Sequence, residues 1–235
     1  MRYQKTLLGA MVDSGIKYER VILLSGQDFP VWSKRQIRSY FEKWPTREFI
    51  EGMNLTKSKN RRQLDKIVLF HFFRDFPIGL LKGALISKSR KVMHFLPFRK
   101  PPVVQLGGKD VDVYFGSDYW ALTYPCACFV YEKLSTEKNF ENYFRTSYAP
   151  SELCVQTIVF NSQYGRNAIL YEGEYLGLSY LTPLHYINYK DKIKVLTKAD
   201  LPIIKASEKM FCRKVVSGIS DGLVETLLKE WESAK

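Results

Sequence analysis

A buried apolar run near the N-terminus leads directly into a polar turn that carries a carboxylate. The run Arg20-Val21-Ile22-Leu23-Leu24 predicts a strand over residues 20–25, and the turn is Ser25-Gly26-Gln27-Asp28-Phe29-Pro30. Enzymes of the α/β class commonly place a functional side chain where a strand ends. Asp28 is therefore a candidate residue of a site loop, and an ordinary exit from a strand is the alternative.

A second carboxylate, Glu152, has the chemistry of a general base. It lies in Tyr148-Ala149-Pro150-Ser151-Glu152, where Pro150 suits the first position of a helix that we expect to run to about Phe160. A carboxylate within hydrogen-bond reach can take the proton of an attacking hydroxyl. Glutamate in the first turn of a helix is also stabilised by the helix dipole, so a structural role is the alternative.

The elements that position these residues alternate between helix and strand. Ser33 and Gln36 form a capping-box pattern at the start of a helix that Pro45 ends. Apolar spacing and capping residues predict further helices over residues 3–16, 123–134 and 138–146, a last helix capped by Ser220, and short strands over 48–52 and 166–196. This alternation predicts an α/β protein.

The composition is that of a folded domain with a large positive charge. The chain has 235 residues, of which 46% are hydrophobic, and its formal net charge is +12. Such an excess favours an anionic partner, which leaves nucleic acid, an acidic membrane surface and a phosphorylated small molecule. We find no RNA- or DNA-binding motif and expect no nucleic-acid partner.

Two stretches concentrate the basic residues. Residues 54–66 are rich in lysine and arginine, which indicates a solvated helix face or a contact with an anion or a sugar. Residues 79–102 hold six basic residues and no acidic one, with apolar residues between them. This pattern fits peripheral contact with a membrane surface, and a basic loop and helix packed on the domain is the alternative.

Five segments occur in the order found in one enzyme family. They are the hexapeptide at 25–30, Phe49-Ile50-Glu51-Gly52, Gly116-Ser117-Asp118-Tyr119-Trp120, Tyr148-Ala149-Pro150-Ser151-Glu152 with Gln156-Thr157, and Met210-Phe211-Cys212-Arg213-Lys214. Each segment is weak alone, but in sequence order they are specific and cover most of the chain. In them the chain resembles the core-2/I-branching β-1,6-N-acetylglucosaminyltransferases, a family that also contains the protein xylosyltransferases.

The resemblance implies a GT-A-like nucleotide-sugar transferase fold and an inverting, metal-independent transfer. UDP-N-acetylglucosamine would be the donor substrate, and a hydroxyl of a glycan acceptor, usually the 6-position, would attack it. We therefore expect a single glycosyltransferase domain over residues 1–235 that needs no cofactor. The reaction demands a base for the acceptor hydroxyl and positive charge around the departing diphosphate.

The resemblance also implies the residues on the base and donor side. Glu152 matches the catalytic base, although the family more often has Asp where this chain has Ser151. Lys214 matches the lysine that binds the donor diphosphate, with Arg213 beside it, and a solvated charged end is the alternative for this pair. Ser117 belongs to a loop of the site.

A second basic contact with the diphosphate is expected about twenty residues upstream of Lys214. Lys190, Lys192 and Lys194 compete for this role, and Lys192 is the residue we favour.

On the acceptor side, Glu51 matches a glutamate that binds the acceptor. Lys59 and Arg62 match two basic residues of the sugar pocket by their spacing from Glu51. Carboxylates and guanidinium groups suit bidentate bonds to neighbouring hydroxyls. Tyr189 lies near an aromatic position that stacks on the acceptor in relatives, and a core tyrosine is the alternative.

A metal site is not expected. Asp110 and Asp112 form an Asp-x-Asp pattern like the manganese site of other GT-A enzymes, and alternate strand residues share a face. The pattern is frequent by chance, and this family has no metal ligand there. The four cysteines form no Cys-x-x-Cys pair, so a zinc site is not predicted either.

The family's domain begins with elements that precede the segment matching residues 1–30, and these carry much of the uridine pocket. We therefore expect an N-terminally truncated domain that is missing its first strands. The exposed sheet edge would need a partner or a missing segment to complete it. The alternative to an enzyme is a non-catalytic relative that binds glycan or assembles with a partner.

The sequence predicts a cytoplasmic protein, peripheral at the membrane if residues 79–102 bind it. The chain begins Met1-Arg2-Tyr3-Gln4-Lys5 and continues as an amphipathic segment, which is not the pattern of a signal peptide. The most apolar stretch, residues 67–81, contains His71, Arg74 and Asp75, so no transmembrane span is predicted. We interpret the four cysteines as reduced thiols.

Overall fold

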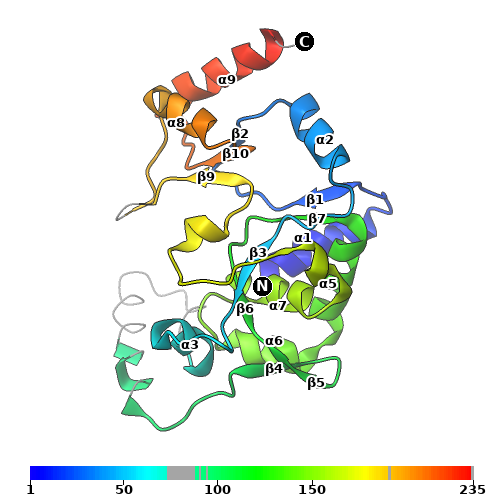
Figure 1. The fold of residues 1–235 in the computed structure, drawn as a ribbon, viewed down its shortest axis with the longest axis vertical. Coiled ribbons are helices and arrows are strands. Elements are labelled where there is room, and N and C mark those ends of the chain that lie inside the picture. Colours follow the sequence, from blue (N-terminus) through cyan, green and yellow to red (C-terminus); the bar gives the residue numbers. More distant parts are fainter. Residues whose placement is uncertain (73–87, 90, 94, 190–191, 234–235) are drawn as a thin grey trace.

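The computed structural model describes residues 1–72, 88–89, 91–93, 95–189 and 192–233 (Figure 1). Helices and strands are mixed along the chain, as predicted. The α-helices are α1 (Arg2–Asp13), α2 (Lys34–Glu42), α3 (Arg61–Val68), α5 (Tyr124–Thr136), α6 (Lys138–Arg145), α7 (Cys154–Phe160), α8 (Leu201–Ala206) and α9 (Asp221–Ser233). The 3₁₀-helices are η1 (Pro150–Glu152), η2 (Gln163–Asn167), η3 (Leu178–Leu181) and η4 (Lys198–Asp200).

The strands are short and form several small sheets in the described residues. They are β1 (Arg20–Ile22), β2 (Asp28–Pro30), β3 (Glu51–Asn54), β4 (Val103–Leu106), β5 (Lys109–Asp112), β6 (Tyr114–Phe115), β7 (Ala121–Thr123), β8 (Ile169–Leu170), β9 (His185–Ile187) and β10 (Phe211–Arg213). Strand β3 is antiparallel to β6 and parallel to β8, and β10 is antiparallel to β2 and parallel to β9. The strands β1 and β7, and β4 and β5, form antiparallel pairs.

The sheet β6-β3-β8 lies beside the helices α1, α5 and α7 (Figure 1). Its packing depends on two glycines that lie against neighbouring groups. A Cβ atom at Gly116 would lie 2.0 Å from the carbonyl oxygen of Glu51, and one at Gly52 would lie 2.5 Å from the Phe160 ring. These contacts explain why the Phe49–Gly52 and Gly116–Trp120 segments end or begin with glycine.

The sheet β2-β10-β9 is covered by α9, whose C-terminal end lies at the edge of the molecule (Figure 1). Leu223 and Leu227 of α9 are fully buried in a core cluster with Cys212 of β10. The Trp231 ring stacks on Phe29 with centroids 5.7 Å apart, and its indole nitrogen donates to the carbonyl of Val31 at 3.1 Å.

Local sequence signals explain the starts of several helices. The predicted capping box is confirmed, because the Gln36 amide donates to the Ser33 hydroxyl and the Ser33 amide donates to the Gln36 side chain. The Thr123 hydroxyl caps α5 as predicted and also donates to Glu48 at 2.6 Å. The buried Glu48 carboxylate therefore ties the start of α5 to the chain just before β3.

Other predictions of elements were wrong in detail. The expected helix from Pro150 to Phe160 is broken into η1 and α7, because Leu153 lies between them outside regular helical geometry. The expected strand over residues 20–25 ends at Ile22. Ser220 does lie directly before α9, and its carbonyl accepts from the Val224 amide; its hydroxyl accepts from the Val216 amide at 3.0 Å and donates to the Leu196 carbonyl at 2.6 Å.

Candidate functional site

Glu152 is the last residue of η1, in a loop held by backbone contacts on two sides. Its amide donates to the Ala149 carbonyl at 2.9 Å, and its carbonyl accepts from the Gly116 amide at 2.9 Å. Ala149 has φ 44° and ψ 64°, the left-handed conformation that L-residues with a side chain adopt only at a cost. The Gln4 side chain of α1 donates to the Ser151 carbonyl at 3.2 Å. Helix α1 and the Gly116–Trp120 segment therefore fix the loop that carries Glu152.

Glu152 lines a cavity of about 570 Å³ with residues of α3 and with aromatic side chains. Arg62 and Lys66 come from α3, and being four residues apart they lie on the same face of that helix. The remaining lining residues are Asp65, Leu69, His71, Phe115, Tyr148, Tyr175 and Leu178. The structure thus places in one cavity two residues that the family resemblance had suggested for the site, Glu152 and Arg62.

Lys66 is a charged residue of this cavity that the sequence analysis did not single out. Its ammonium nitrogen lies 3.5 Å from the centroid of the Phe115 ring and 4.9 Å from that of Tyr175. Burial lowers the pKa of Lys66 to about 8, and the negative charge of Glu152 opposes that effect. The spacing of Lys66 from Arg62 is the sequence signal that could have placed it in the site.

A second polar cluster lies where β2, β9 and β10 meet. The Arg213 guanidinium donates to Asp28 Oδ1 at 3.0 Å and to the Ser25 hydroxyl, while the Ser25 amide donates to Asp28 Oδ2 at 2.6 Å. The Asp28 carboxylate is fully buried, and His185 Nε2 lies 3.6 Å from it. Burial alone would raise the pKa of Asp28, but its contacts with His185, Ser25 and Arg213 lower it below the ordinary value.

This buried carboxylate therefore stays ionised and compensates the charge of Arg213. The Arg213 guanidinium also lies over the Tyr119 ring, 5.5 Å from its centroid. Ser117, two residues earlier, is buried, and its hydroxyl accepts from the Tyr119 amide at 3.2 Å. The Ser117 carbonyl accepts from the Gln156 side chain at 2.5 Å, which links this loop to α7.

Tyr189 interacts electrostatically with Glu152 of the cavity and with Arg213 of the second polar cluster. Burial raises the pKa of its phenol, the charge of Glu152 raises it further, and the charge of Arg213 lowers it. Its side chain is partly exposed to solvent. Tyr189 is not among the residues that line the Glu152 cavity, but its ring is exposed enough for stacking on a ligand.

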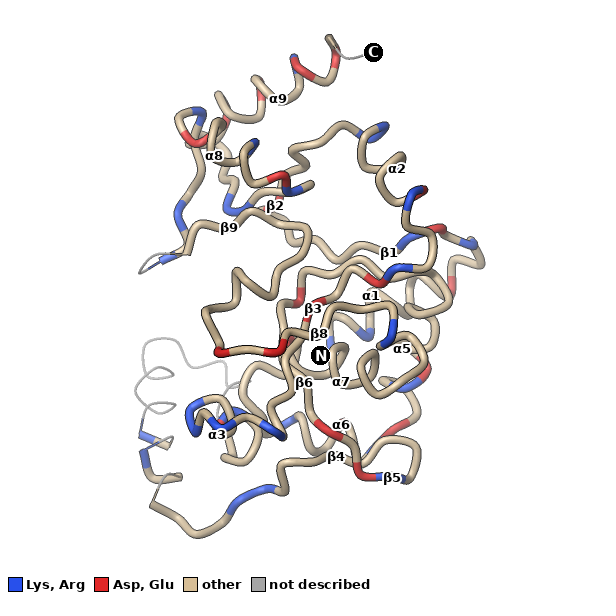
Figure 2. Tube along the Cα trace, in the orientation of Figure 1, with Lys and Arg blue, Asp and Glu red and all other residues tan. Residues whose placement is uncertain are grey.

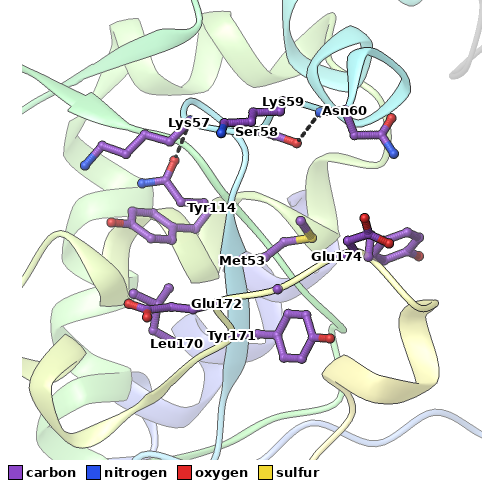
Figure 3. A pocket seen from close by; sticks show the side chains of 13 residues that line it. Met53, Lys57, Ser58, Lys59, Asn60, Tyr114, Leu170, Tyr171, Glu172 and Glu174 are labelled. Atoms are coloured by element: carbon purple, nitrogen blue, oxygen red, sulfur yellow. Dashed lines mark hydrogen bonds between the residues drawn. The ribbon is translucent and has the colours of Figure 1, made fainter.

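The other residues predicted for the acceptor side do not line the Glu152 cavity. Glu51 lies at the start of β3, where burial raises its pKa and the charges of Lys209 and Arg47 lower it. Lys59 lines a neighbouring cavity, shown in Figure 3, which Tyr175 also lines. Lys59 and Arg62 are therefore separated by the start of α3, where the Asn60 side chain accepts from the Arg62 amide at 3.0 Å.

The lysines predicted for the donor diphosphate lie in the strand and loop beside β9 and β10. Lys214 follows β10, and its carbonyl accepts from the Leu196 amide at 2.8 Å. Lys194 forms an ion pair with Asp200 at 2.5 Å, so its charge is already compensated by that carboxylate. Lys192 is exposed, and Lys190 lies outside the described residues. Figure 2 shows basic residues along the chain from β9 toward α8.

The Asp-x-Asp pattern is part of the β4-β5 hairpin. Asp112 accepts from the Asn54 side chain at 2.8 Å and pairs with Lys57 at 3.1 Å. These contacts give Asp112 a role in joining the hairpin to β3. Within the described part of the chain, no three His, Cys, Asp or Glu side chains are grouped as metal ligands.

Only part of the predicted membrane-contact segment, residues 79–102, can be placed. Residues 79–87, 90 and 94 lie outside the described residues. Phe95 is 89% exposed, whereas Lys100 is buried and donates to the Ser147 hydroxyl at 2.6 Å. Burial lowers the pKa of Lys100 to about 7, so Lys100 is not a surface charge available to lipid. Among the described residues, no helix has the length and apolar character needed to cross a membrane.

Comparison with known proteins identifies the family. The family model described as Core-2/I-Branching enzyme matches residues 1–173, which include β3, the Gly116–Trp120 loop and Glu152. Tyr189, Lys192, Arg213 and Lys214 lie beyond the matched range. No curated protein matches the chain. The chain belongs to the core-2/I-branching enzyme family.

Proposed function

We propose that the protein is an inverting, metal-independent glycosyltransferase. It moves N-acetylglucosamine or a similar sugar from a UDP-sugar to a hydroxyl of an acceptor sugar, in a β-1,6 linkage. The family match supports glycosyl transfer in general. The observation that carries the specific proposal is that Glu152 shares a cavity with Arg62, Lys66 and tyrosine side chains.

Glu152 acts as the general base in this proposal. The acceptor oxygen forms a bond to the anomeric carbon, while the bond from that carbon to the diphosphate oxygen breaks. The acceptor proton passes to the Glu152 carboxylate, and the bonding electrons leave with UDP. A single displacement of this kind inverts the configuration at the anomeric carbon. Arg62 and Tyr189 hold the acceptor ring while the proton is transferred.

Lys214 is the principal contact with the diphosphate, and Lys192 assists it. Arg213 is the weaker candidate, because its guanidinium is already compensated by the buried Asp28. Side-chain ammonium groups supply the positive charge that a metal supplies in other transferases. Glu51, the first residue of β3, contributes to acceptor binding.

The replacement Glu152→Gln tests this function most directly. It removes the base but keeps the shape of the side chain, so we expect the transfer rate from UDP-N-acetylglucosamine to fall by about 10²- to 10⁴-fold. The affinity for UDP should change by less than about threefold, because Glu152 does not bind the donor in this proposal.

Glu132→Gln is the matched control, since Glu132 lies exposed on α5 and makes an ion pair with Lys133 outside both cavities. This variant should transfer sugar at the wild-type rate. Transfer by Glu152→Gln at a similar rate would remove Glu152 from its role as the base. Glycan binding without transfer and without UDP binding would instead indicate a non-catalytic relative.

A further inference from the structure

Val92, Phe95 and Phe98 expose apolar side chains to solvent within one short stretch of the chain. Their exposed fractions are 52%, 89% and 67%. Phenylalanine and valine are among the residues most often buried, and exposed apolar side chains that gather in one place mark an interaction surface. We call the group of Val92, Phe95 and Phe98 the Phe95 surface.

The Phe95 surface belongs to a folded turn, because the chain around it is tied to the body of the protein. Met93 packs against the main core cluster, and the Arg99 guanidinium donates to the Met93 carbonyl at 3.0 Å. The Lys100 amide donates to the Val68 carbonyl at 2.8 Å. This stretch lies at the margin of the molecule, in the blue-green part of the chain (Figure 1). Its exposed side chains are therefore presented by anchored backbone.

Positive charge adjoins the Phe95 surface. Lys88 and Lys91 are exposed, and the described positions from Lys88 to Phe95 have helical backbone. Lys88 lies four residues before Val92, and Lys91 lies four residues before Phe95, so each lysine neighbours an apolar side chain on the helix surface. Residues 79–102 contain no Asp or Glu. The surface thus combines apolar side chains with positive charge that no carboxylate of the same stretch offsets.

This combination fits an anionic lipid surface better than a nucleic acid or a peptide. At such a bilayer, apolar side chains enter the boundary between headgroups and acyl chains, and lysines approach the lipid phosphates. The stem of a lysine is apolar and can follow into this boundary while its ammonium group stays in water. Specific recognition of a nucleic acid or a peptide depends largely on hydrogen bonds, which the side chains of the Phe95 surface cannot form.

The sequence predicted contact with a membrane over residues 79–102, and the structure narrows the residues available for it. Lys100 is buried, and its ammonium group is bound to Ser147. We propose that the Phe95 surface, with Lys88 and Lys91 beside it, docks the protein on an anionic lipid bilayer. This docking is independent of glycosyl transfer, and it places the chain at a membrane surface through a peripheral contact.

Sedimentation of the full chain with lipid vesicles tests the proposal. The protein should bind vesicles of phosphatidylcholine with about 30% phosphatidylglycerol at least about tenfold more tightly than vesicles of phosphatidylcholine alone, and added salt should weaken this binding. Phe95→Ser should lower the affinity about tenfold, because a small polar side chain replaces the ring that enters the bilayer. Lys91→Gln should lower it about fivefold by removing one charge near the lipid phosphates.

Two control variants remove the same kinds of group from other elements. Tyr180→Ser removes an aromatic side chain that is 60% exposed in η3, and Lys109→Gln removes an exposed charge from the β4-β5 hairpin. Both variants should bind vesicles as the wild type does. Because the Phe95 side chain is almost wholly exposed, Phe95→Ser should keep the wild-type midpoint of thermal unfolding, and a loss of binding is then not a loss of folding.

Three results would overturn the proposal. The first is a wild-type protein that does not bind anionic vesicles. The second is equal binding by Phe95→Ser and Tyr180→Ser, or by Lys91→Gln and Lys109→Gln, which would assign any attraction to the overall charge of +12. The third is a single-stranded RNA that binds more tightly than the vesicles and whose binding is lost in Phe95→Ser, which would indicate stacking on bases.

Discussion

Lys66 places a positive charge among aromatic rings in the Glu152 cavity, and burial makes that charge costly. The folded protein holds the proton of Lys66 only up to about pH 8, whereas an unfolded chain holds it to about pH 10.4. Between these values the unfolded state binds more protons, so this residue makes the free energy of unfolding rise with pH. We predict that the free energy of unfolding of Lys66→Met lacks this rise with pH. Urea unfolding of the wild type and of Lys66→Met between pH 7 and pH 10 measures the difference.

The same measurement reveals the coupling between Lys66 and the proposed base. The charge of Glu152 raises the pKa of Lys66, so in Glu152→Gln the rise should begin at a lower pH than in the wild type. Other groups that titrate in this range, such as the buried Lys100, are present in all three proteins and cancel in the differences. Parallel stability curves for wild type and Lys66→Met would show that Lys66 titrates as an ordinary surface lysine.

At the scale of elements, the turn η1 depends on the left-handed backbone at Ala149. Alanine adopts this conformation at a cost of about 1–2 kcal/mol, and glycine adopts it freely. The greater conformational freedom of glycine in the unfolded chain offsets about 0.4–1 kcal/mol of the gain in the free energy of unfolding. We therefore predict that Ala149→Gly stabilises the fold by up to about 1 kcal/mol in denaturant unfolding, and that it lowers the transfer rate by loosening the loop of Glu152.

Ala168→Gly provides the comparison for this element. Ala168 follows η2 with φ −99° and ψ 173°, an extended conformation that alanine adopts without strain. Glycine there should cost at least about 0.4–1 kcal/mol from the entropy of the unfolded chain, and the partly buried methyl group of Ala168 also loses its packing on the core. Loss of stability in both variants would mean that the backbone at Ala149 is not strained.

Elements set by neighbouring residues could be predicted from the sequence, and contacts between distant residues could not. The capping box of Ser33 depends on residues three positions apart, and it was found. The pair of Asp28 and Arg213 joins residues 185 positions apart, and no local pattern indicates it. The lysine at 59 and the arginine at 62 were assigned to one pocket by spacing, but the cap at Asn60 turns the chain between them.

On the scale of the whole molecule, the net charge of +12 favours an anionic ligand, and in the proposed function Lys214 binds the donor diphosphate. We predict that UDP raises the midpoint of thermal unfolding to the same extent with and without EDTA, because lysine side chains take the place of a metal. Lys214→Ala removes one charged hydrogen bond to the diphosphate, worth about 1.5–3 kcal/mol, so UDP affinity should fall at least tenfold.

Lys109→Ala removes the same charge from an exposed position in the β4-β5 hairpin. It therefore distinguishes the effect of a direct contact with the diphosphate from the effect of the protein's overall electrostatic field. If the field of the whole molecule dominated, both lysine variants would weaken UDP binding equally, and by less than the loss of a direct contact. We expect Lys109→Ala to bind UDP as the wild type does. Binding that disappears in EDTA would contradict the metal-independent mechanism. Equal effects of the two variants would instead show that the diphosphate does not bind at Lys214. The comparison with Glu152→Gln would then still test glycosyl transfer.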